Sequence, residues 1–111
     1  MRIGIAQLNP TVGDLQGNLG LAIDAYEQLV GQGTDLVVFP ELMLCGYPPR
    51  DLLAKERFLR DVRSSLDEFA RQTGPVPALI GFPEEAQEHS SKAYNSAALC
   101  LNGKTGQVFR K

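Results

Sequence analysis

The sequence predicts an α/β fold whose elements follow the order strand, helix, strand, helix, strand, strand, strand. Three patterns support this order. Apolar residues recur at helical spacing in residues 19–30 and 52–70. Residues 35–40 are apolar on both faces, which is typical of a buried strand in a parallel sheet. Residues 102–106 read Asn-Gly-Lys-Thr-Gly, a strong hairpin signal that makes the last two strands antiparallel.

The first strand and the first helix have clear boundaries. Residues 2–8 are rich in small and β-branched residues, and this strand ends before Pro10 because proline cannot donate a ladder hydrogen bond. Asn18 is expected to cap the helix, since asparagine side chains accept hydrogen bonds from free N–H groups at helix starts. Gly31 and Gly33 then end it.

The later elements are separated by proline, glycine and acidic residues. Asp51 is expected to cap the second helix, and Gly74 is expected to end it. Pro83 is expected to stop the third strand, and the acidic segment 84–91 is expected to be a solvated turn. The strands predicted for this half are residues 78–82, 94–101 and 107–110.

Composition and charge restrict the function classes. The chain has 111 residues and a formal net charge of −2, which argues against a nucleic-acid-binding surface. No apolar run approaches the ~20 residues that cross a bilayer, so neither nucleic acid nor a membrane is an expected partner. Cys45 and Cys100 are too few for a disulfide framework, so we expect free thiols in a reducing cytoplasm.

The predicted sheet lacks cover on one face. The two amphipathic helices can cover one face, and no further helix is available for the other. A strand such as residues 35–40 requires cover on both sides. We therefore expect these residues to be part of a larger domain.

Two charged positions lie at predicted strand ends. Glu41 follows a buried strand and Pro40, where open α/β sheets place their ligands. Apolar neighbours would desolvate this carboxyl and raise its proton affinity, which suits a general acid or base. The alternative is a surface carboxylate or a cap of the next segment. Arg110 and Lys111 are either solvated edge charges or a cation that stabilises an oxyanion.

The cysteines and the single histidine carry weaker signals. Cys45 lies four residues after Glu41, but a buried apolar role is commoner for a free cysteine than a nucleophilic one. Cys100 is a weaker candidate still. His89 lies in the acidic segment without a second ligand at metal-binding spacing, so no metal site is predicted. No glycine-rich loop precedes a helix in a way that would hold a nucleotide.

Several segments together resemble the nitrilase, or carbon–nitrogen hydrolase, superfamily over essentially all 111 residues. The matching motifs are residues 3–9, 34–42, 93–97 and 106–111. Residues 46–53, which read Gly-Tyr-Pro-Pro-Arg-Asp-Leu-Leu, are similar to the glutaminase domain of the glutamine-dependent NAD synthetases.

The resemblance implies a partial α-β-β-α sandwich that usually pairs with a second copy, and a catalytic glutamate, lysine and cysteine. The glutamate falls on Glu41 and the lysine on Lys111, while the cysteine belongs to a later part of the domain. Tyr47 is placed at the mouth of the substrate pocket. Residues 1–111 would be the N-terminal part of a glutaminase domain, inactive without the cysteine.

The resemblance also implies a reaction and its partners. Glutamine would be hydrolysed to release ammonia. A separate synthetase domain, absent from this sequence, would use ATP and magnesium to amidate nicotinic acid adenine dinucleotide. The complete protein is expected to be a homo-oligomer. Two alternatives remain open: another nitrilase-type amidase or carbamoylase, and a non-catalytic interaction fragment.

Overall fold

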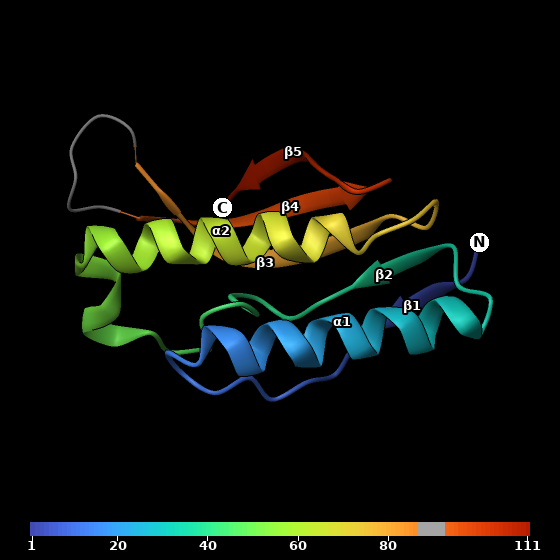
Figure 1. Ribbon diagram of the computed structural model, residues 1–111, viewed down its shortest axis with the longest axis horizontal. Helices are drawn as coiled ribbons and strands as arrows, with labels where there is room; N and C mark the ends of the chain where they lie inside the picture. The colour runs from blue at the N-terminus through green and yellow to red at the C-terminus, as the bar shows by residue number, and fades with distance from the viewer. Residues whose placement is uncertain (87–92) are drawn as a thin grey trace.

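The computed structural model describes residues 1–86 and 93–111. His89 and most of the acidic segment 84–91 lie outside the described residues. The elements follow the predicted order, with one additional short 3₁₀ helix (Figure 1). They are β1 (Ile3–Ile5), α1 (Leu15–Gly31), β2 (Leu36–Val38), η1 (Arg50–Ala54), α2 (Glu56–Arg71), β3 (Ala78–Glu85), β4 (Ala93–Leu101) and β5 (Lys104–Arg110).

The five strands form one mixed sheet in the order β1-β2-β3-β4-β5. β1, β2 and β3 are parallel, and β4 and β5 extend the sheet in antiparallel fashion. Both helices lie on the same face of the sheet (Figure 1). This confirms the α/β class, and the chain contributes one helix layer and one sheet of the sandwich that the resemblance implies.

The core lies between the helices and the sheet. Phe69 of α2 is fully buried, and its ring meets the rings of Tyr26 and Phe39 edge-on at centroid distances of 6.0 and 5.3 Å. Val37 and Ile80 reach the same core from β2 and β3. Edge-on aromatic pairs of this kind add to the free energy gained from burying apolar area.

Both predicted helix caps are wrong. Asp14 caps α1, and its Oδ1 accepts a hydrogen bond from the Gly17 N–H at 3.0 Å. Asn18 is instead buried within the helix. Asp51 lies in η1, and α2 begins only at Glu56 because Lys55 is extended, with φ −99° and ψ 112°. An extended residue interrupts the helical hydrogen bonds, so the two helices are separate.

The prediction that Pro83 ends the third strand is also wrong, since β3 continues to Glu85. The carbonyl groups of Leu79 and Gly81 face β2 and the segment after it, where they accept from Phe39 and Leu44. Pro83 is two residues beyond Gly81, so its backbone nitrogen also faces the β2 side of the sheet. β2 ends at Val38, so no strand lies there to accept the hydrogen bond that proline cannot donate. Pairing with β4 therefore continues unbroken through Pro83.

The hairpin between β4 and β5 is tighter than the sequence suggests. Only Asn102 and Gly103 form the turn, with φ values of +52° and +80°. Two consecutive positive φ angles are typical of a type I′ turn. β5 therefore begins at Lys104 rather than at residue 107, and a register shift opposite Leu99 accommodates the additional residue.

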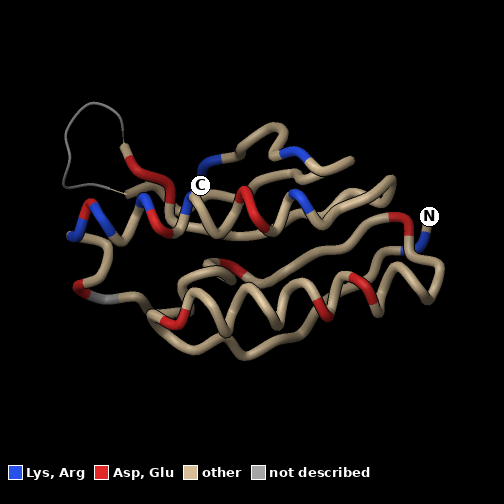
Figure 2. Tube along the Cα trace, viewed as in Figure 1, with Lys and Arg blue, Asp and Glu red and all other residues tan. Residues whose placement is uncertain are grey.

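The face of the sheet away from the helices is apolar and uncovered, as predicted. Ile3 and Ile5 are 52% and 67% exposed, and Phe109 is 46% exposed. Charged residues occur along the helices, whereas β1 and β2 contain none (Figure 2). An exposed apolar surface of this kind marks a contact site.

Candidate active site

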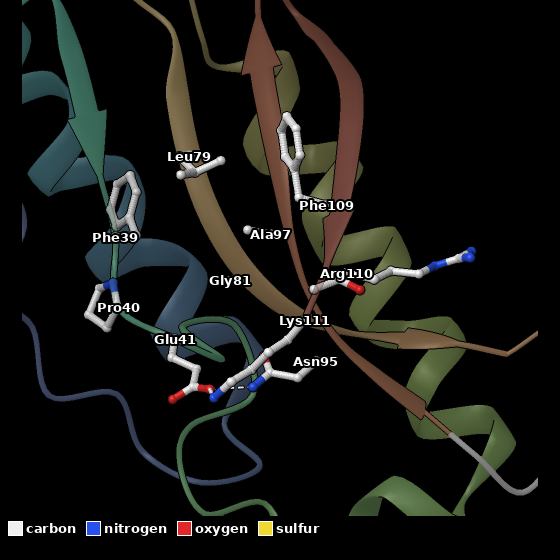
Figure 3. Close-up of a pocket in the computed structure, with 11 residues that line it drawn as sticks. Phe39, Pro40, Glu41, Leu79, Gly81, Asn95, Ala97, Phe109, Arg110 and Lys111 are labelled. Carbon is white, nitrogen blue, oxygen red and sulfur yellow. Dashed lines mark hydrogen bonds and ion pairs between the residues drawn. The ribbon is translucent and has the colours of Figure 1, made fainter.

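A cavity of about 410 Å³ lies on the uncovered face and extends from the end of β2 across β3 and β4 to the end of β5 (Figure 3). Its wall combines apolar side chains from the sheet with a small group of polar ones. The lining residues are Phe39, Pro40, Glu41, Leu79, Gly81, Asn95, Ser96, Ala97, Phe109, Arg110 and Lys111. Cavities with a few convergent polar groups on an apolar wall are typical of small-molecule sites.

Three polar side chains converge at this cavity. Glu41 follows β2, Asn95 lies on β4, and Lys111 follows β5. Lys111 Nζ lies 3.3 Å from Glu41 Oε1, and Asn95 Nδ2 donates a hydrogen bond to the same oxygen. Figure 3 shows the amide and the ammonium group approaching the carboxylate together. Glu41 and Lys111, predicted separately from the sequence, are thus in contact although 70 residues separate them.

The turn that carries Glu41 packs directly on β3. A Cβ on Gly81 would lie 2.5 Å from the Leu42 nitrogen and 2.7 Å from the Pro40 oxygen, so only glycine allows this approach. Leu42 has a φ of +52°, which is unfavourable for a non-glycine residue. The strained turn and the missing side chain on β3 together fix where Glu41 lies.

Asn18 holds the segment that follows. Its Nδ2 donates to the carbonyl oxygens of Thr11 and Leu44, at 2.8 and 3.0 Å, and its Oδ1 accepts from the Thr11 N–H at 2.8 Å. The side chain is 1% exposed. Asn18 thus joins the loop after β1 to the loop after β2, and its role is to anchor loops rather than to cap α1.

The electrostatics of Glu41 differ from the sequence-based expectation. The hydrogen bond from Asn95, and then the hydrogen bond and positive charge of Lys111, hold the pKa of the Glu41 carboxyl below its ordinary value. Its side chain is 47% exposed, so desolvation is the smaller influence. Glu41 is therefore ionised at neutral pH and can accept a proton.

Neither cysteine of this chain lines the cavity. Cys45 is fully buried, with its Sγ 3.3 Å from the Gly46 carbonyl oxygen, and burial raises the pKa of the thiol to about 11. Cys100 is also fully buried, and its thiol pKa is raised to about 11 by the same cause. Both thiols are protonated at neutral pH, which favours the apolar role expected for them.

The remaining candidates are placed as follows. Tyr47 is 65% exposed and does not line the cavity, so its role in substrate binding stays a prediction. Sequence reasoning missed Asn95 and Gly81 as site residues. The available signal for Asn95 was a polar side chain on a strand that is otherwise largely apolar. For Gly81 it was a glycine inside a strand, which often marks a close approach of another backbone.

Across residues 1–86 and 93–111, no three His, Cys, Asp or Glu side chains gather in a way that could hold a metal ion. None of the described helices combines the length and the apolar character needed to span a membrane.

A known protein family matches almost the whole chain. The family model for carbon–nitrogen hydrolases matches residues 2–111. The chain belongs to the carbon–nitrogen hydrolase family. Among curated carbon–nitrogen hydrolase relatives, a glutamine-dependent NAD(+) synthetase from Thermotoga maritima is 45% identical over 113 residues, which cover 100% of this chain and 19% of that protein.

Solved structures agree with the family. A glutamine-dependent NAD(+) synthetase from Cytophaga hutchinsonii superposes with a TM-score of 0.92 at 25% identity, covering 100% of this chain and 19% of that one. An amidase from Nesterenkonia sp. gives a TM-score of 0.81 at 28% identity, covering 100% of this chain and 42% of that one. This carbon–nitrogen hydrolase chain therefore spans about a fifth of the NAD synthetases it matches.

Proposed function

We propose that these residues form the N-terminal part of the glutaminase domain of a glutamine-dependent NAD synthetase. The contact between Lys111 Nζ and Glu41 Oε1, 3.3 Å apart at an apolar cavity, is the observation that carries this proposal. It supplies a proton acceptor beside a fixed positive charge, which is what hydrolysis of an amide by a thiol requires. The 45% identical relative from Thermotoga maritima, named as a glutamine-dependent NAD(+) synthetase, supports glutamine as the amide.

The first half of the reaction forms a thioester. A cysteine thiol from outside residues 1–111 transfers its proton to the Glu41 carboxylate, and the thiolate attacks the side-chain amide carbon of glutamine. Negative charge develops on the amide oxygen, and the Lys111 ammonium group stabilises it. Loss of one such donor typically costs ~10²–10³ in rate. Glu41 then returns its proton to the leaving nitrogen, and ammonia departs.

The second half regenerates the enzyme. Glu41 accepts a proton from a water molecule, which attacks the thioester carbon, and the thiol leaves with that proton. The products are glutamate and the free cysteine. An ionised Glu41 suits both steps because it must accept a proton each time, and its lowered pKa supports this state.

The proposal extends to the rest of the protein. Ammonia would pass to a synthetase domain that amidates nicotinic acid adenine dinucleotide with ATP and magnesium, in a cytoplasmic homo-oligomer. The matched relatives are about five times as long as this chain, so they have room for such a domain. ATP and magnesium would bind in that domain, and no step at Glu41 depends on them.

A second candidate function is hydrolysis of another amide. The similarity to the Nesterenkonia amidase extends over the whole chain, which supports amide hydrolysis without specifying glutamine. A variant of that amidase carries the acetamide moiety of fluoroacetamide on its active site cysteine. A comparison of glutamine with acetamide and carbamoyl substrates separates the two candidates.

The test uses the complete reading frame that contains these residues. We expect it to encode a further cysteine and a nucleotide-binding domain, and its product to release ammonia from glutamine. Lys111→Met should lower the rate of this release by ~10²–10³, whereas Glu56→Gln, on the exposed surface of α2, should not change it. A product that ignores glutamine would contradict the proposal. So would ammonia release by residues 1–111 alone that Cys45→Ser abolishes.

A further inference from the structure

A second polar cluster joins β3, β4 and β5. Glu84 of β3 accepts from Arg110 of β5 through both carboxylate oxygens, with Nε–Oε1 at 2.8 Å and Nη2–Oε2 at 3.0 Å. Ser96 of β4 donates to Glu84 Oε1 at 2.9 Å, and the Arg110 guanidinium lies 4.4 Å from the centroid of the Tyr94 ring. We call Glu84, Ser96 and Arg110 the three-strand cluster.

This cluster and the Glu41 site lie on opposite faces of the sheet. Ser96 follows Asn95 in β4, and Arg110 precedes Lys111 at the end of β5. Because neighbouring residues of a strand point to opposite faces, Asn95 and Lys111 face Glu41 while Ser96 and Arg110 face the helix side. Figure 3 shows the Arg110 side chain pointing away from the carboxylate that Lys111 approaches.

The same stretch of backbone carries residues of the three-strand cluster and of the Glu41 site. Ser96 pairs with Arg110 in the strand register, and the Lys111 N–H donates to the Asn95 carbonyl at 2.9 Å. The Lys111 side chain itself is 77% exposed, and the described residues give its ammonium group one polar contact, Glu41. The direction of Lys111 therefore depends on how firmly Arg110 and its neighbours hold the end of β5.

The three-strand cluster is built to hold that end. The Glu84 side chain is only 16% exposed. In the other ion pairs between described residues, every charged side chain is at least 44% exposed. A two-point arginine–carboxylate contact fixes orientation as well as distance. The hydrogen bonds from Arg110 and Ser96, together with the positive charges of Arg110 and of Arg63 on α2, hold the pKa of the Glu84 carboxyl below its ordinary value.

We propose that Glu84 and Arg110 are positioning residues that act through the backbone of β5 to hold the Lys111 ammonium group against Glu41. This inference rests on the proposed function, since it assigns Lys111 to the reaction. It makes the reactivity of the site dependent on an ion pair whose side chains lie on the opposite face of the sheet from Glu41.

The test combines kinetics with a titration. In the full-length protein, Glu84→Gln and Arg110→Met should each lower kcat for glutamine about tenfold or more and change KM little, because a misplaced catalytic group costs rate. Each should also raise the pKa of Glu41, followed by ¹³C NMR of its carboxyl carbon, because Lys111 moves away. Arg110→Lys, which keeps the charge but not the two-point contact, should give an intermediate kcat.

Glu56→Gln is the matched control, because it breaks the exposed Arg60 pair on α2. It should change neither kcat nor the pKa of Glu41. Wild-type values of both quantities in Glu84→Gln and Arg110→Met would overturn the positioning role, and so would an equal loss in Glu56→Gln. If the protein hydrolyses another amide but not glutamine, the proposed function fails, while the same variants on that amide and the Glu41 titration still decide the positioning role.

Discussion

Gly81 and Leu42 touch through their backbones at the turn that presents Glu41. A Cβ on residue 81 would lie 2.5 Å from the Leu42 nitrogen, closer than such atoms approach in proteins. The main chain of the turn would have to move, and Glu41 would move with it. This contact links the interior of β3 to the chemistry at the end of β2.

Gly81→Ala should therefore reduce both activity and stability. We expect a loss of about 10²-fold in glutamine hydrolysis, the size of effect produced by a misplacement of about 1 Å, and a loss of about 1–3 kcal/mol in the free energy of unfolding from overpacking. Activity assays and urea unfolding measure the two effects. Gly20→Ala is the matched control: it meets no atom within 4 Å and should slightly stabilise α1. Full activity in Gly81→Ala would show that the turn has room to adjust.

Asn95→Ala should raise the pKa of Glu41. The Asn95 hydrogen bond is the largest cause of the lowered value, and Lys111 is the next. A general base works only when ionised, so a higher pKa moves the acid limb of the kcat/KM profile to higher pH. The profile in the full-length protein and a ¹³C titration of Glu41 measure the shift. Lys111→Met should raise the same pKa, whereas Gln16→Ala, on the surface of α1, should not. An acid limb that stays in place in Asn95→Ala would rule out this role for the amide.

Local patterns were sufficient to predict most of the fold. The helical spacing of residues 19–30 and 52–70, the apolar run at 35–40 and the Asn-Gly turn each depend on neighbours in the chain, and the corresponding elements are present. Details that depend on partners from elsewhere were not predictable in this way. Pro83 continues β3 because β2 ends early, and nothing near Pro83 in the sequence indicates where β2 ends.

The candidate site shows the same division. Glu41 and Lys111 could be identified by position and resemblance, but Asn95 and Gly81 act only because the sheet brings them to Glu41. The predicted direction of the shift in the Glu41 pKa was wrong for this reason. Apolar neighbours in sequence suggested desolvation, while the groups that dominate come from β4 and the end of β5.

Asn18→Ala should destabilise the loops around the site. It removes the partner of the Leu44 carbonyl group in buried surroundings and of the Thr11 carbonyl and N–H groups, whose hydrogen bonds are only partly buried. An unpaired buried group costs about 1–3 kcal/mol, and a partly buried one costs less because water can reach it. We expect a total loss of about 2–4 kcal/mol, measured by urea unfolding. Hydrogen exchange should increase at Thr11 more than in β4. Gln16→Ala, two residues earlier on the exposed face of α1, should remain within about 0.5 kcal/mol of the wild type. Equal stability of the two variants would contradict the anchoring role of Asn18.

The uncovered face of the sheet should make residues 1–111 associate when they are produced alone. Ile5 is 67% and Phe109 46% exposed on that face, and an apolar surface of this kind is removed from water by contact with another molecule. Ile5→Lys together with Phe109→Lys should shift the chain toward monomer in light scattering, because a lysine on each position opposes close contact. Leu21→Lys is the matched control, since Leu21 is 42% exposed on α1, and it should leave association unchanged. If the wild-type chain is a stable monomer at high concentration, the face does not require cover. If Leu21→Lys dissociates the chain as well as the double variant does, the copies associate through their helices and not through the uncovered face of the sheet.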